Sequence, residues 1–262
     1  PQKMRLDLYL KENGLAKSRT QAAEWITQGR VRVNDVPTAK PAYPVEDADT
    51  VTLTPPDTIY VSRGAWKLCH ALDAWRIDVS GLRVLDIGAS TGGFTDCLLR
   101  RGARHVYALD SGTGQLDPSL CGDARVTNLE NRNARYMQSD DFGGRCDMAV
   151  SDVSFISQTL ILPVVPQVVI PGGFYIGLVK PQFECGREAL SKNGIVRDKK
   201  HRLSALERVY DCMCTCGMVP RYASVSPITG GDGNVEFLIG ALCGDTDTKP
   251  FDRQILREVA YG

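Results

Sequence analysis

The chain has 262 residues, of which 43% are hydrophobic and 24% are charged, and its formal net charge is zero. This composition is ordinary for a folded globular protein, and the length allows one large domain and one small one. An apolar stretch at residues 159–170 contains Pro163 and Pro166 and is shorter than the roughly 18 residues that a membrane span needs. We therefore expect no stable membrane association. We also expect no signal peptide, because Arg5 and Asp7 interrupt the apolar residues near the start of the chain.

The nine cysteines are an odd number, and most of them stand in apolar segments. We expect these to be reduced and mostly buried, in a cytoplasmic protein. The cysteines of this kind are Cys69, Cys97, Cys121, Cys146, Cys185 and Cys243. Cys212, Cys214 and Cys216 form a C-x-C-x-C run, which differs from the C-x-x-C spacing of a zinc site. We predict no metal site.

Residues 3–56 are predicted to form a small α+β domain. Leucines at short intervals predict a first helix that ends near Gly14. Ser18 and Gln21 form a capping box that starts a second helix, and Gly29 ends that helix. Strands are expected at residues 31–35, running into an Asn-Asp turn, and at residues 51–53.

Basic residues gather around the second helix of this domain and the strand after it. On charge alone, a solvated helix face and a phosphate-binding patch explain them equally well. The stretches Arg-Leu-Asp-x-x-Leu, Ala-Lys-Ser-Arg-Thr-Gln-Ala and Ile-x-x-Gly-Arg-Val-Arg-Val-Asn resemble the RNA-binding module of ribosomal protein S-four. The resemblance implies a structured-RNA partner, with Arg19, Arg30 and Arg32 contacting phosphates. The full set of predicted RNA-binding residues is Arg5, Lys17, Arg19, Arg30, Arg32 and Arg63.

A linker is predicted at residues 57–62, followed by a second domain at 63–243 and a C-terminal extension at 244–262. In the second domain strand and helix patterns alternate, which predicts a mostly parallel, doubly wound α/β sheet. The predicted strands are 84–87, 105–109, 126–129, 147–151, 173–178, 222–226 and 235–241, and the predicted helices are 95–101, 157–169 and 199–216. Ligands of such sheets bind beyond the carboxyl ends of the strands, at the topological switch.

A glycine-rich turn follows the strand at 84–87. Its pattern, D-x-G-x-x-x-G-G from Asp86, is neither G-x-G-x-x-G nor a P-loop. Asp110 ends the next strand, where an acid suits a pair of ribose hydroxyls. An α/β turn without a ligand is the alternative. The pattern resembles motifs I and II of the class I S-adenosylmethionine methyltransferases, which implies S-adenosyl-L-methionine as the cofactor. The implied cofactor contacts are Asp86, Gly88, Ser90, Gly92, Gly93, Phe94, Asp110, Asn133 and Asp152.

Charged residues also follow later strands. Asp152 and Lys180 come after neighbouring parallel strands, and Pro181 directly follows Lys180. Glu236 lies inside an apolar predicted strand, where a carboxylate needs a cationic partner. Lys67, in an apolar-rich first helical turn, reads by itself as a surface lysine. Taken singly, these residues fit a structural ion-pair network as well as they fit a catalytic site.

Taken together, Lys67, Asp152, Lys180 and Glu236 resemble the catalytic Lys-Asp-Lys-Glu tetrad of the FtsJ-like ribose 2′-O-methyltransferases. With the N-terminal module in front, the chain resembles the TlyA (haemolysin A) family. This implies a Rossmann-like domain with a seven-stranded mixed sheet that methylates cytidine in 16S or 23S rRNA, or in both, within ribosomal subunits. Two stretches near the cofactor depart from the family pattern: residues 131–133, Asn-Arg-Asn, and residues 111–113, Ser-Gly-Thr.

The residues leave two roles open for Lys180. It can act as the base toward a ribose hydroxyl if burial or Lys67 favours its neutral form. If the carboxylates dominate, it stays charged, orients the hydroxyl and stabilises developing negative charge. Two other functions also stay open: a membrane-active cytolysin, as the haemolysin name suggests, and a non-catalytic ribosome-binding factor. The oligomeric state is not predicted.

Overall fold

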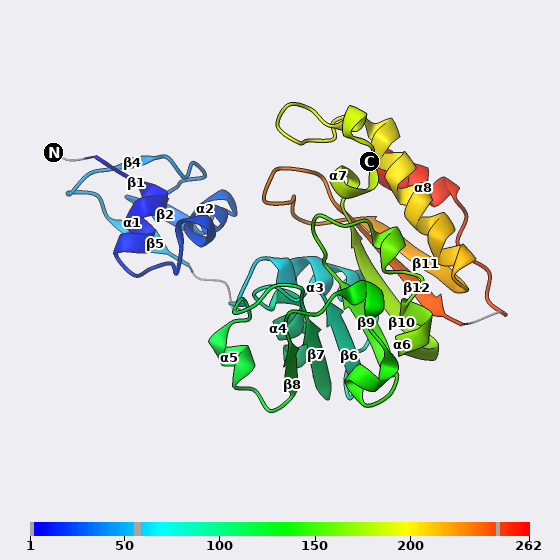
Figure 1. Ribbon diagram of the computed structural model, residues 1–262. Helices are drawn as coiled ribbons and strands as arrows, with labels where there is room; N and C mark the ends of the chain where they lie inside the picture. Colours follow the sequence, from blue (N-terminus) through cyan, green and yellow to red (C-terminus); the bar gives the residue numbers. More distant parts are fainter. Residues whose placement is uncertain (1–2, 55–58, 245–246) are drawn as a thin grey trace. The chain divides into compact units, whose positions relative to one another are not determined.

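The computed structural model describes residues 3–54, 59–244 and 247–262 of the chain. The chain divides into two compact units, one ending at Ile59 and the other beginning at Tyr60 (Figure 1). This division falls inside the predicted linker at residues 57–62. Residues 55–58, which include the first two linker residues, lie outside the described residues.

The first unit is a small α+β domain, as predicted. Its elements are β1 (Met4–Arg5), α1 (Leu6–Glu12), α2 (Arg19–Thr27), β2 (Val31–Val33), β3 (Val36–Pro37), β4 (Pro44–Val45) and β5 (Val51–Leu53). The predicted Ser18 cap is present, since the backbone N–H of Gln21 donates to Ser18 Oγ at 3.2 Å. The reciprocal half of the predicted capping box is shifted by one residue, because Gln21 Oε1 accepts from the backbone N–H of Lys17 at 2.8 Å. Asn34 and Asp35 have φ values of 51° and 64°, so they form the turn between β2 and β3. Leu6, Leu10, Ile26 and Val31 are fully buried in one core.

The second unit is built on one seven-stranded mixed sheet in the order β11-β12-β10-β9-β6-β7-β8. The five strands from β10 to β8 are parallel, whereas β12 is antiparallel to β10 and to β11. Figure 1 shows the strands side by side, with β8 at one edge. The strands are β6 (Arg83–Ile87), β7 (His105–Leu109), β8 (Val126–Leu129), β9 (Cys146–Ser151), β10 (Val169–Val179), β11 (Met218–Val225) and β12 (Phe237–Cys243). This confirms the doubly wound fold.

Helices and short 3-10 turns connect these strands. They are α3 (Gly64–Ala74), α4 (Gly93–Arg100), α5 (Pro118–Cys121), η1 (Ala134–Tyr136), η2 (Ser139–Phe142), η3 (Gln158–Leu160), α6 (Val165–Val168), α7 (Pro181–Glu184), η4 (Arg187–Ala189), α8 (Lys199–Thr215) and α9 (Gln254–Tyr261). The predicted helices at 95–101 and 199–216 are confirmed as α4 and α8, with ends that differ by one or two residues.

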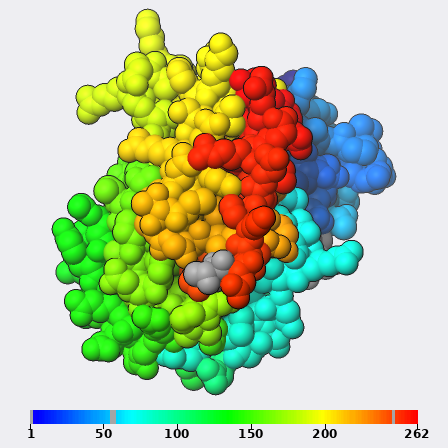
Figure 2. All heavy atoms as spheres, turned by 90° about the vertical axis from the view of Figure 1, so that its right-hand side faces the viewer, coloured from blue at the N-terminus to red at the C-terminus, as the bar shows by residue number. Residues whose placement is uncertain are grey.

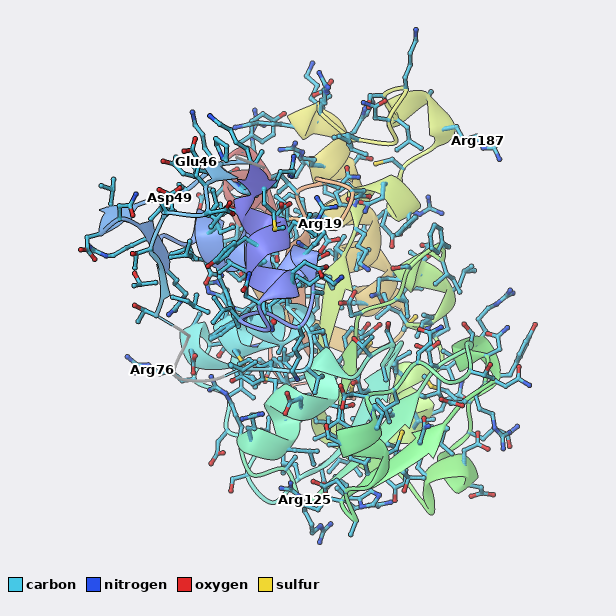
Figure 3. The ribbon with its side chains drawn as sticks, turned by 90° about the vertical axis from the view of Figure 1, so that its left-hand side faces the viewer. Arg19, Glu46, Asp49, Arg76, Arg125 and Arg187 are labelled. Atoms are coloured by element: carbon cyan, nitrogen blue, oxygen red, sulfur yellow. The ribbon has the colours of Figure 1, made fainter. Side chains whose placement is uncertain are left out.

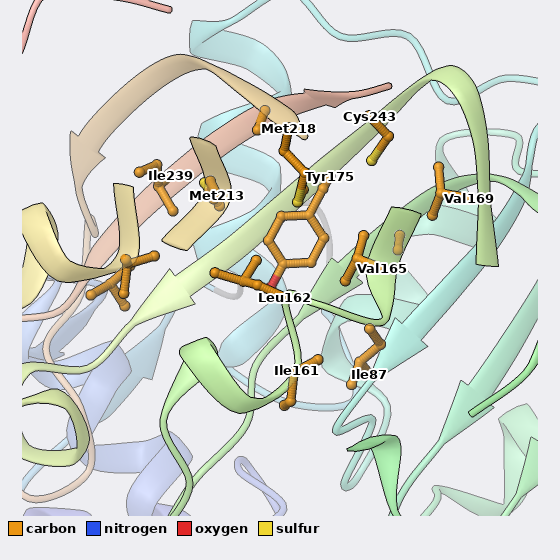
Figure 4. Packing of buried hydrophobic residues seen from close by; sticks show 14 of the residues in the cluster. Ile87, Ile161, Leu162, Val165, Val169, Tyr175, Met213, Met218, Ile239 and Cys243 are labelled. Atoms are coloured by element: carbon orange, nitrogen blue, oxygen red, sulfur yellow. The ribbon is translucent and has the colours of Figure 1, made fainter. Parts of the chain in front are cut away.

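The sheet is buried on both faces because its strands alternate between two cores. Val84 packs with α3 and α4, while its neighbour Leu85 packs with α6, α8 and α9. Tyr175 of β10 stands in the second core, among Met213, Met218 and other apolar side chains (Figure 4). Parallel strands that are covered on both sides read as continuous apolar runs, which is why they were recognisable in the sequence.

Two predictions about the second unit are wrong. The expected helix at 157–169 is a 3-10 turn, η3, followed by the single-turn helix α6, after which β10 already begins at Val169. Pro163 and Pro166 prevent one continuous helix, because each lacks a backbone N–H and its ring clashes with the preceding turn. Glu236 was expected inside the last strand but directly precedes it, since β12 begins at Phe237.

The C-terminal residues complete the second core. Leu256 and Ala260 of α9 are buried against α8 and β11. Figure 2 shows the C-terminal segment, in red, lying along the yellow and orange surface of α8 and β11. All nine cysteines are described and are free thiols, but Cys121 is exposed where burial was expected. Among residues 3–54, 59–244 and 247–262, the helices are too short or too polar to cross a membrane.

A buried carboxylate ties the two helices of the first unit together. Asp7 is 4% exposed, and its Oδ2 lies 2.9 Å from the guanidinium of Arg5 and 3.1 Å from that of Arg19 (Arg19 is labelled in Figure 3). The hydrogen bond from Arg5 lowers the pKa of Asp7 from its ordinary 3.8 to about 2, with help from Arg19. This interaction therefore stabilises the unit fully above about pH 4 and is lost as the pH falls through 2.

We expect Asp7→Asn to weaken the first unit at pH 7 by about 1–2 kcal/mol, a value discounted because both arginines are half exposed. Amide hydrogen exchange in α1 and α2 should then accelerate by about 5- to 30-fold. Asp47→Asn, at an exposed acid of the same unit, is the matched control and should exchange like the wild type. Unchanged protection in Asp7→Asn would contradict the expectation.

Candidate active site

The candidate site lies at the carboxyl edge of the central strands, where polar residues follow β9 and β10. The backbone N–H of Asp152 donates to the carbonyl oxygen of Ile87 at 3.0 Å, so the chain stays beside β6 for one residue after β9 ends. Lys180 follows β10 and is held at the start of α7, whose first residue is Pro181. Since β9 and β10 are parallel neighbours, Asp152 and Lys180 leave the sheet at the same edge.

Two more charges reach this edge from an antiparallel strand and from a helix. In the register of β10 with β12, Val179 is opposite Phe237, so Lys180 and Glu236 stand at the same end of the paired strands. Lys67 projects from α3, and its Nζ lies 2.6 Å from Glu236 Oε2. The carboxylate of Glu236 thus has the cationic partner that its apolar surroundings require.

We call Lys67, Asp152, Lys180 and Glu236 the charge cluster. Lys180 Nζ lies 2.7 Å from Asp152 Oδ1, an ion pair that lacks aligned hydrogen-bond geometry, and it donates to Ser154 Oγ at 2.8 Å. Lys67 Nζ lies 3.9 Å from Asp152 Oδ2, so Asp152 stands between the two lysines. Lys67 is only 6% exposed, and its default interpretation as a surface lysine is therefore wrong. Two cations and two anions offset part of the cost of burying one another.

The three glycines of the turn are needed for different reasons. Gly88 has a φ of +81°, and a Cβ there would stand 2.9 Å from the backbone oxygen that follows β9. Gly92 has a φ of +96°, and its Cβ would collide with Leu120 at 2.3 Å. A Cβ on Gly93 would meet Ser62 Oγ at 2.2 Å, just before α3. The turn is therefore packed tightly against three other segments. Of its three glycines, Gly88 and Gly93 line one or both of the two cavities described below.

Asp86, the first acid of the glycine motif, is fully buried. Its Oδ2 accepts a hydrogen bond from Thr95 Oγ1 at 2.7 Å, and its Oδ1 has no hydrogen-bond partner among the described residues. Burial raises the pKa of Asp86 to about 7, and the neighbouring charge of Asp152 adds to this. Through Thr95, Asp86 fixes the first turn of α4 to the end of β6. Neither Asp86 nor Gly92 lines the two cavities described next.

The larger cavity has a volume of about 370 Å³ and is bordered by the glycine turn and the loops after β7, β8 and β9. Asp110 accepts hydrogen bonds from the backbone N–H groups of Ser90, at 2.8 Å, and Gly112, at 2.7 Å. Its carboxylate is thereby fixed at the cavity wall. The predicted cofactor residues that line this cavity are Gly88, Ser90, Asp110, Asn133 and Asp152.

A second cavity of about 200 Å³ lies over the charge cluster. It shares Gly88, Ser90, Asp152 and Ser154 with the larger cavity. The predicted site residues that line it are Arg63, Lys67, Gly88, Ser90, Gly93, Phe94, Asp152 and Lys180. Glu236 lines neither cavity and stands behind Lys67. A donor held in one cavity and an acceptor held in the other would meet beside Asp152 and Lys180.

Several residues of this site were not predicted. Ser154 contacts Lys180, and Phe155 beside it is 91% exposed with a φ of +63°, although a large exposed aromatic side chain in the left-handed region is rare. Its ring centroid lies 5.1 Å from that of Phe183. Arg132 and Gln115 also line the larger cavity. The sequence signal for Ser154 and Phe155 was their position directly after Asp152 and Val153, in the loop that follows β9.

The predicted RNA-binding residues are distributed over both units. Arg5 and Arg19 pair with Asp7 but keep half of each side chain exposed. Arg32 donates to the carbonyl oxygen of Asp35 at 2.9 Å, and the exposed Lys17 lies just before α2. Arg30 Nε donates to Gln28 Oε1 at 3.0 Å. Arg63 belongs to the second unit, where it precedes α3 and lines the smaller cavity.

In the described part of the chain, no group of three or more histidine, cysteine, aspartate or glutamate side chains is arranged to hold a metal ion. In the C-x-C-x-C run, Cys212 Sγ and Cys216 Sγ lie 3.9 Å apart on α8, and Cys214 is exposed.

Comparisons with known proteins show which families the two parts of the chain resemble. The model of the FtsJ-like methyltransferase family matches residues 60–242, and that of the S4 domain matches residues 4–51. The 16S/23S rRNA (cytidine-2′-O)-methyltransferase TlyA of Mycobacterium tuberculosis is 44% identical over 236 residues, which are 90% of this chain and 88% of that protein. Hemolysin A of Brachyspira hyodysenteriae is 41% identical over 90% of this chain and 98% of its own length.

A solved structure is similar along nearly the whole chain. It belongs to a protein from Streptococcus thermophilus that carries the hemolysin designation, is 40% identical, and covers 99% of this chain and 94% of its own with a TM-score of 0.76. The family resemblance that the sequence motifs predicted is thereby confirmed.

The buried pair of Lys67 and Glu236 allows a test of stability. Glu236→Ala leaves the Lys67 ammonium without its close partner, and we expect a loss of about 3–5 kcal/mol. The double variant Lys67→Met/Glu236→Leu replaces the pair by apolar side chains and should recover most of that loss. Urea unfolding followed by circular dichroism measures both, with the exposed Glu188→Ala as the control. Equal loss in the single and double variants would contradict this account.

Proposed function

Because the chain belongs to the FtsJ-like methyltransferase family, and to the TlyA proteins within it, we propose that it methylates the ribose 2′-oxygen of cytidine in rRNA. The observation that carries the proposal is the charge cluster, because its Asp152 lines both cavities and its Lys67 and Lys180 line the smaller one. An ion-pair network that served stability alone would not need to border two cavities.

S-adenosyl-L-methionine is the proposed methyl donor, and when bound it supplies an electrophilic methyl group on a sulfonium sulfur. The larger cavity fits such a group, because carboxylate, amide and apolar side chains all border it. Asp110 would accept from the ribose hydroxyls, while Leu109, Ile156 and Ile161 provide an apolar wall for the purine. Gly88 and Ser90 line this cavity, so the backbone of the turn would lie close to the bound donor.

Lys180 is proposed to act on the acceptor. Each lysine of the cluster has a carboxylate oxygen within 2.7 Å, which offsets part of the cost of burying its ammonium group. An ammonium at this place can donate to the 2′-oxygen, orient its free lone pair and stabilise the negative charge that develops on it. Asp152 is the most exposed member of the cluster, with 21% of its side chain accessible, and would accept the hydroxyl proton. Lys67 and Glu236 would hold Asp152 in place from behind.

The first unit is proposed to bring the enzyme to structured rRNA in ribosomal subunits, and hence to work in the cytoplasm. Its exposed cations Lys17 and Arg32 and the half-exposed Arg5 and Arg19 are suited to phosphate contacts. Such contacts position the RNA, while the 2′-hydroxyl itself distinguishes RNA from DNA at the reacting atom.

The function is tested with labelled S-adenosyl-L-methionine and ribosomal subunits from cells that lack the protein. The wild type should produce 2′-O-methylcytidine, identified by mass spectrometry after nuclease digestion. Lys180→Ala should lower kcat by about 10²- to 10³-fold, the usual effect of removing one charge-stabilising donor. Lys180→Arg keeps a permanent positive charge at this position and should therefore retain more activity than Lys180→Ala. The exposed Lys192→Ala serves as the control.

A wild-type rate in Lys180→Ala would reject this site. Equal inactivity of Lys180→Arg and Lys180→Ala would instead reject the charged role and favour a base. Leakage of liposomes by the purified protein without cofactor would support the cytolysin alternative.

Phe155 is expected to stack on the base of the target nucleotide, because its ring is exposed beside the cavity that is proposed to hold the donor. One stacked base contributes about 1–3 kcal/mol, so Phe155→Ala should lower kcat/KM for rRNA by about 5- to 150-fold. Phe155→Tyr, which keeps the ring, should stay near the wild type. Titration calorimetry with S-adenosylhomocysteine separates this from a cofactor effect, and equal activity of all three proteins would contradict it.

A further inference from the structure

One buried carboxylate in this region is not part of the charge cluster. Glu184 is the last residue of α7, four residues after Lys180, and it is only 4% exposed. Its Oε2 accepts a hydrogen bond from Ser157 Oγ at 2.5 Å, and its Oε1 accepts one from the backbone N–H of Gln158 at 2.7 Å. Both donors belong to the loop that begins at Asp152. One side chain therefore joins the segment after β10 to the loop after β9.

The side chain of Gln158 continues this connection into the sheet. Its Nε2 donates to Leu178 O at 2.9 Å and to Ser151 Oγ at 3.2 Å. Leu178 lies in β10 two residues before Lys180, and Ser151 is the last residue of β9, directly before Asp152. Its Oε1 accepts from Tyr175 Oη at 2.7 Å. Tyr175 is fully buried in the core, as Figure 4 shows, so the far end of the network is fixed.

The hydrogen bonds of Glu184 join the segment after β10 to the segment after β9, and the ion pair of Lys180 with Asp152 joins the same two segments. Lys180 on one side lies 2.7 Å from Asp152 Oδ1 and 2.8 Å from Ser154 Oγ on the other. A shift of the loop against α7 would change both distances at once. Burying a carboxylate is costly, and burial raises the pKa of Glu184. A buried acid with two strong hydrogen bonds on one loop is suited to fixing that loop.

From these contacts, and resting on the proposed function, we propose that Glu184 is a positioning residue that sets the geometry of Lys180 against Asp152 and Ser154. Glu184 does not line any of the described cavities. It would therefore affect the reaction only by fixing the two segments that it joins. Its loss should therefore lower the rate of methyl transfer without changing the affinity for the cofactor.

Two substitutions separate the hydrogen bonds from the charge. Glu184→Ala removes both hydrogen bonds and leaves the buried N–H of Gln158 without its acceptor. Glu184→Gln keeps the shape, because its oxygen can accept from Gln158 while its amide donates to Ser157 Oγ, which can then donate to Thr159 Oγ1, now 2.7 Å away. The exposed Glu188→Ala removes a carboxylate nearby and is the matched control.

We expect Glu184→Ala to lower kcat for methylation of ribosomal subunits by about 10- to 100-fold, the range that a displacement of about 1 Å produces. Its Kd for S-adenosylhomocysteine and its KM for subunits should stay within about threefold of wild type. Glu184→Gln and Glu188→Ala should remain near the wild-type kcat. In a double-mutant cycle, Glu184→Ala should cost less in the Ser154→Ala background, because both act on the position of Lys180.

A wild-type kcat in folded Glu184→Ala overturns the inference, as does an equal loss in Glu184→Gln or independent effects of Ser154→Ala and Glu184→Ala. If Glu184→Ala fails to fold, Ser157→Ala, which removes one of the two hydrogen bonds, must show a partial loss of kcat. The wild type serves to separate the two proposals: its failure to methylate rRNA rejects the function, whereas normal wild-type activity with an unaffected Glu184→Ala rejects this role alone.

Discussion

The site depends on keeping two ammonium groups and two carboxylates together in a poorly hydrated place. Lys67 and Glu236 form a close pair with almost no exposure, and Lys180 and Asp152 form another at its edge. Each ion alone would cost several kcal/mol to bury, and mutual attraction offsets this cost only when the geometry is good. The charges therefore constrain the four segments that carry them, and the fold must bring those segments to one point.

The reversed direction of β12 makes this convergence possible. Asp152 and Lys180 follow parallel strands, so they leave the sheet at its carboxyl edge. Glu236 precedes its strand, and it reaches the same edge only because β12 runs antiparallel to β10. In a purely parallel sheet, the residue before this strand would lie at the opposite edge. The mixed sheet thus allows residues far apart in the chain to share one desolvated cluster.

Sequence reasoning succeeded where one local pattern determines the structure. Apolar runs located the parallel strands, and the rule that polar groups after such strands share an edge placed Asp152 with Lys180. Glu236 was recognised because an acid among apolar residues needs a partner. Lys67 was not recognisable by itself, since a lysine on an amphipathic helix is usually exposed and its burial depends on α3 packing against the sheet. Only the family resemblance included it in the site.

Other features could not be read from the sequence because they depend on contacts between distant segments. The motif gave Gly88 and Gly92 the same weight, yet Gly88 faces the loop after β9 and Gly92 packs on Leu120. The apolar residues at 157–169 fit a helical pattern, but the chain uses them for a 3-10 turn, a single helical turn and the start of β10. Ser157 and Gln158 stand at the start of this broken path, where both contact Glu184.

The charge around the glycine turn bears on the proposed donor. Asp86, Asp110 and Asp152 all surround this turn, and three full negative charges there would repel one another. Burial raises the pKa of Asp86 to about 7, so near neutral pH it is charged only part of the time. Asp110 is held by two backbone N–H groups, and Asp152 by two lysines. The hydrogen bonds, the two lysines and the partial protonation of Asp86 thus reduce the repulsion that three full carboxylate charges would create beside the proposed donor cavity.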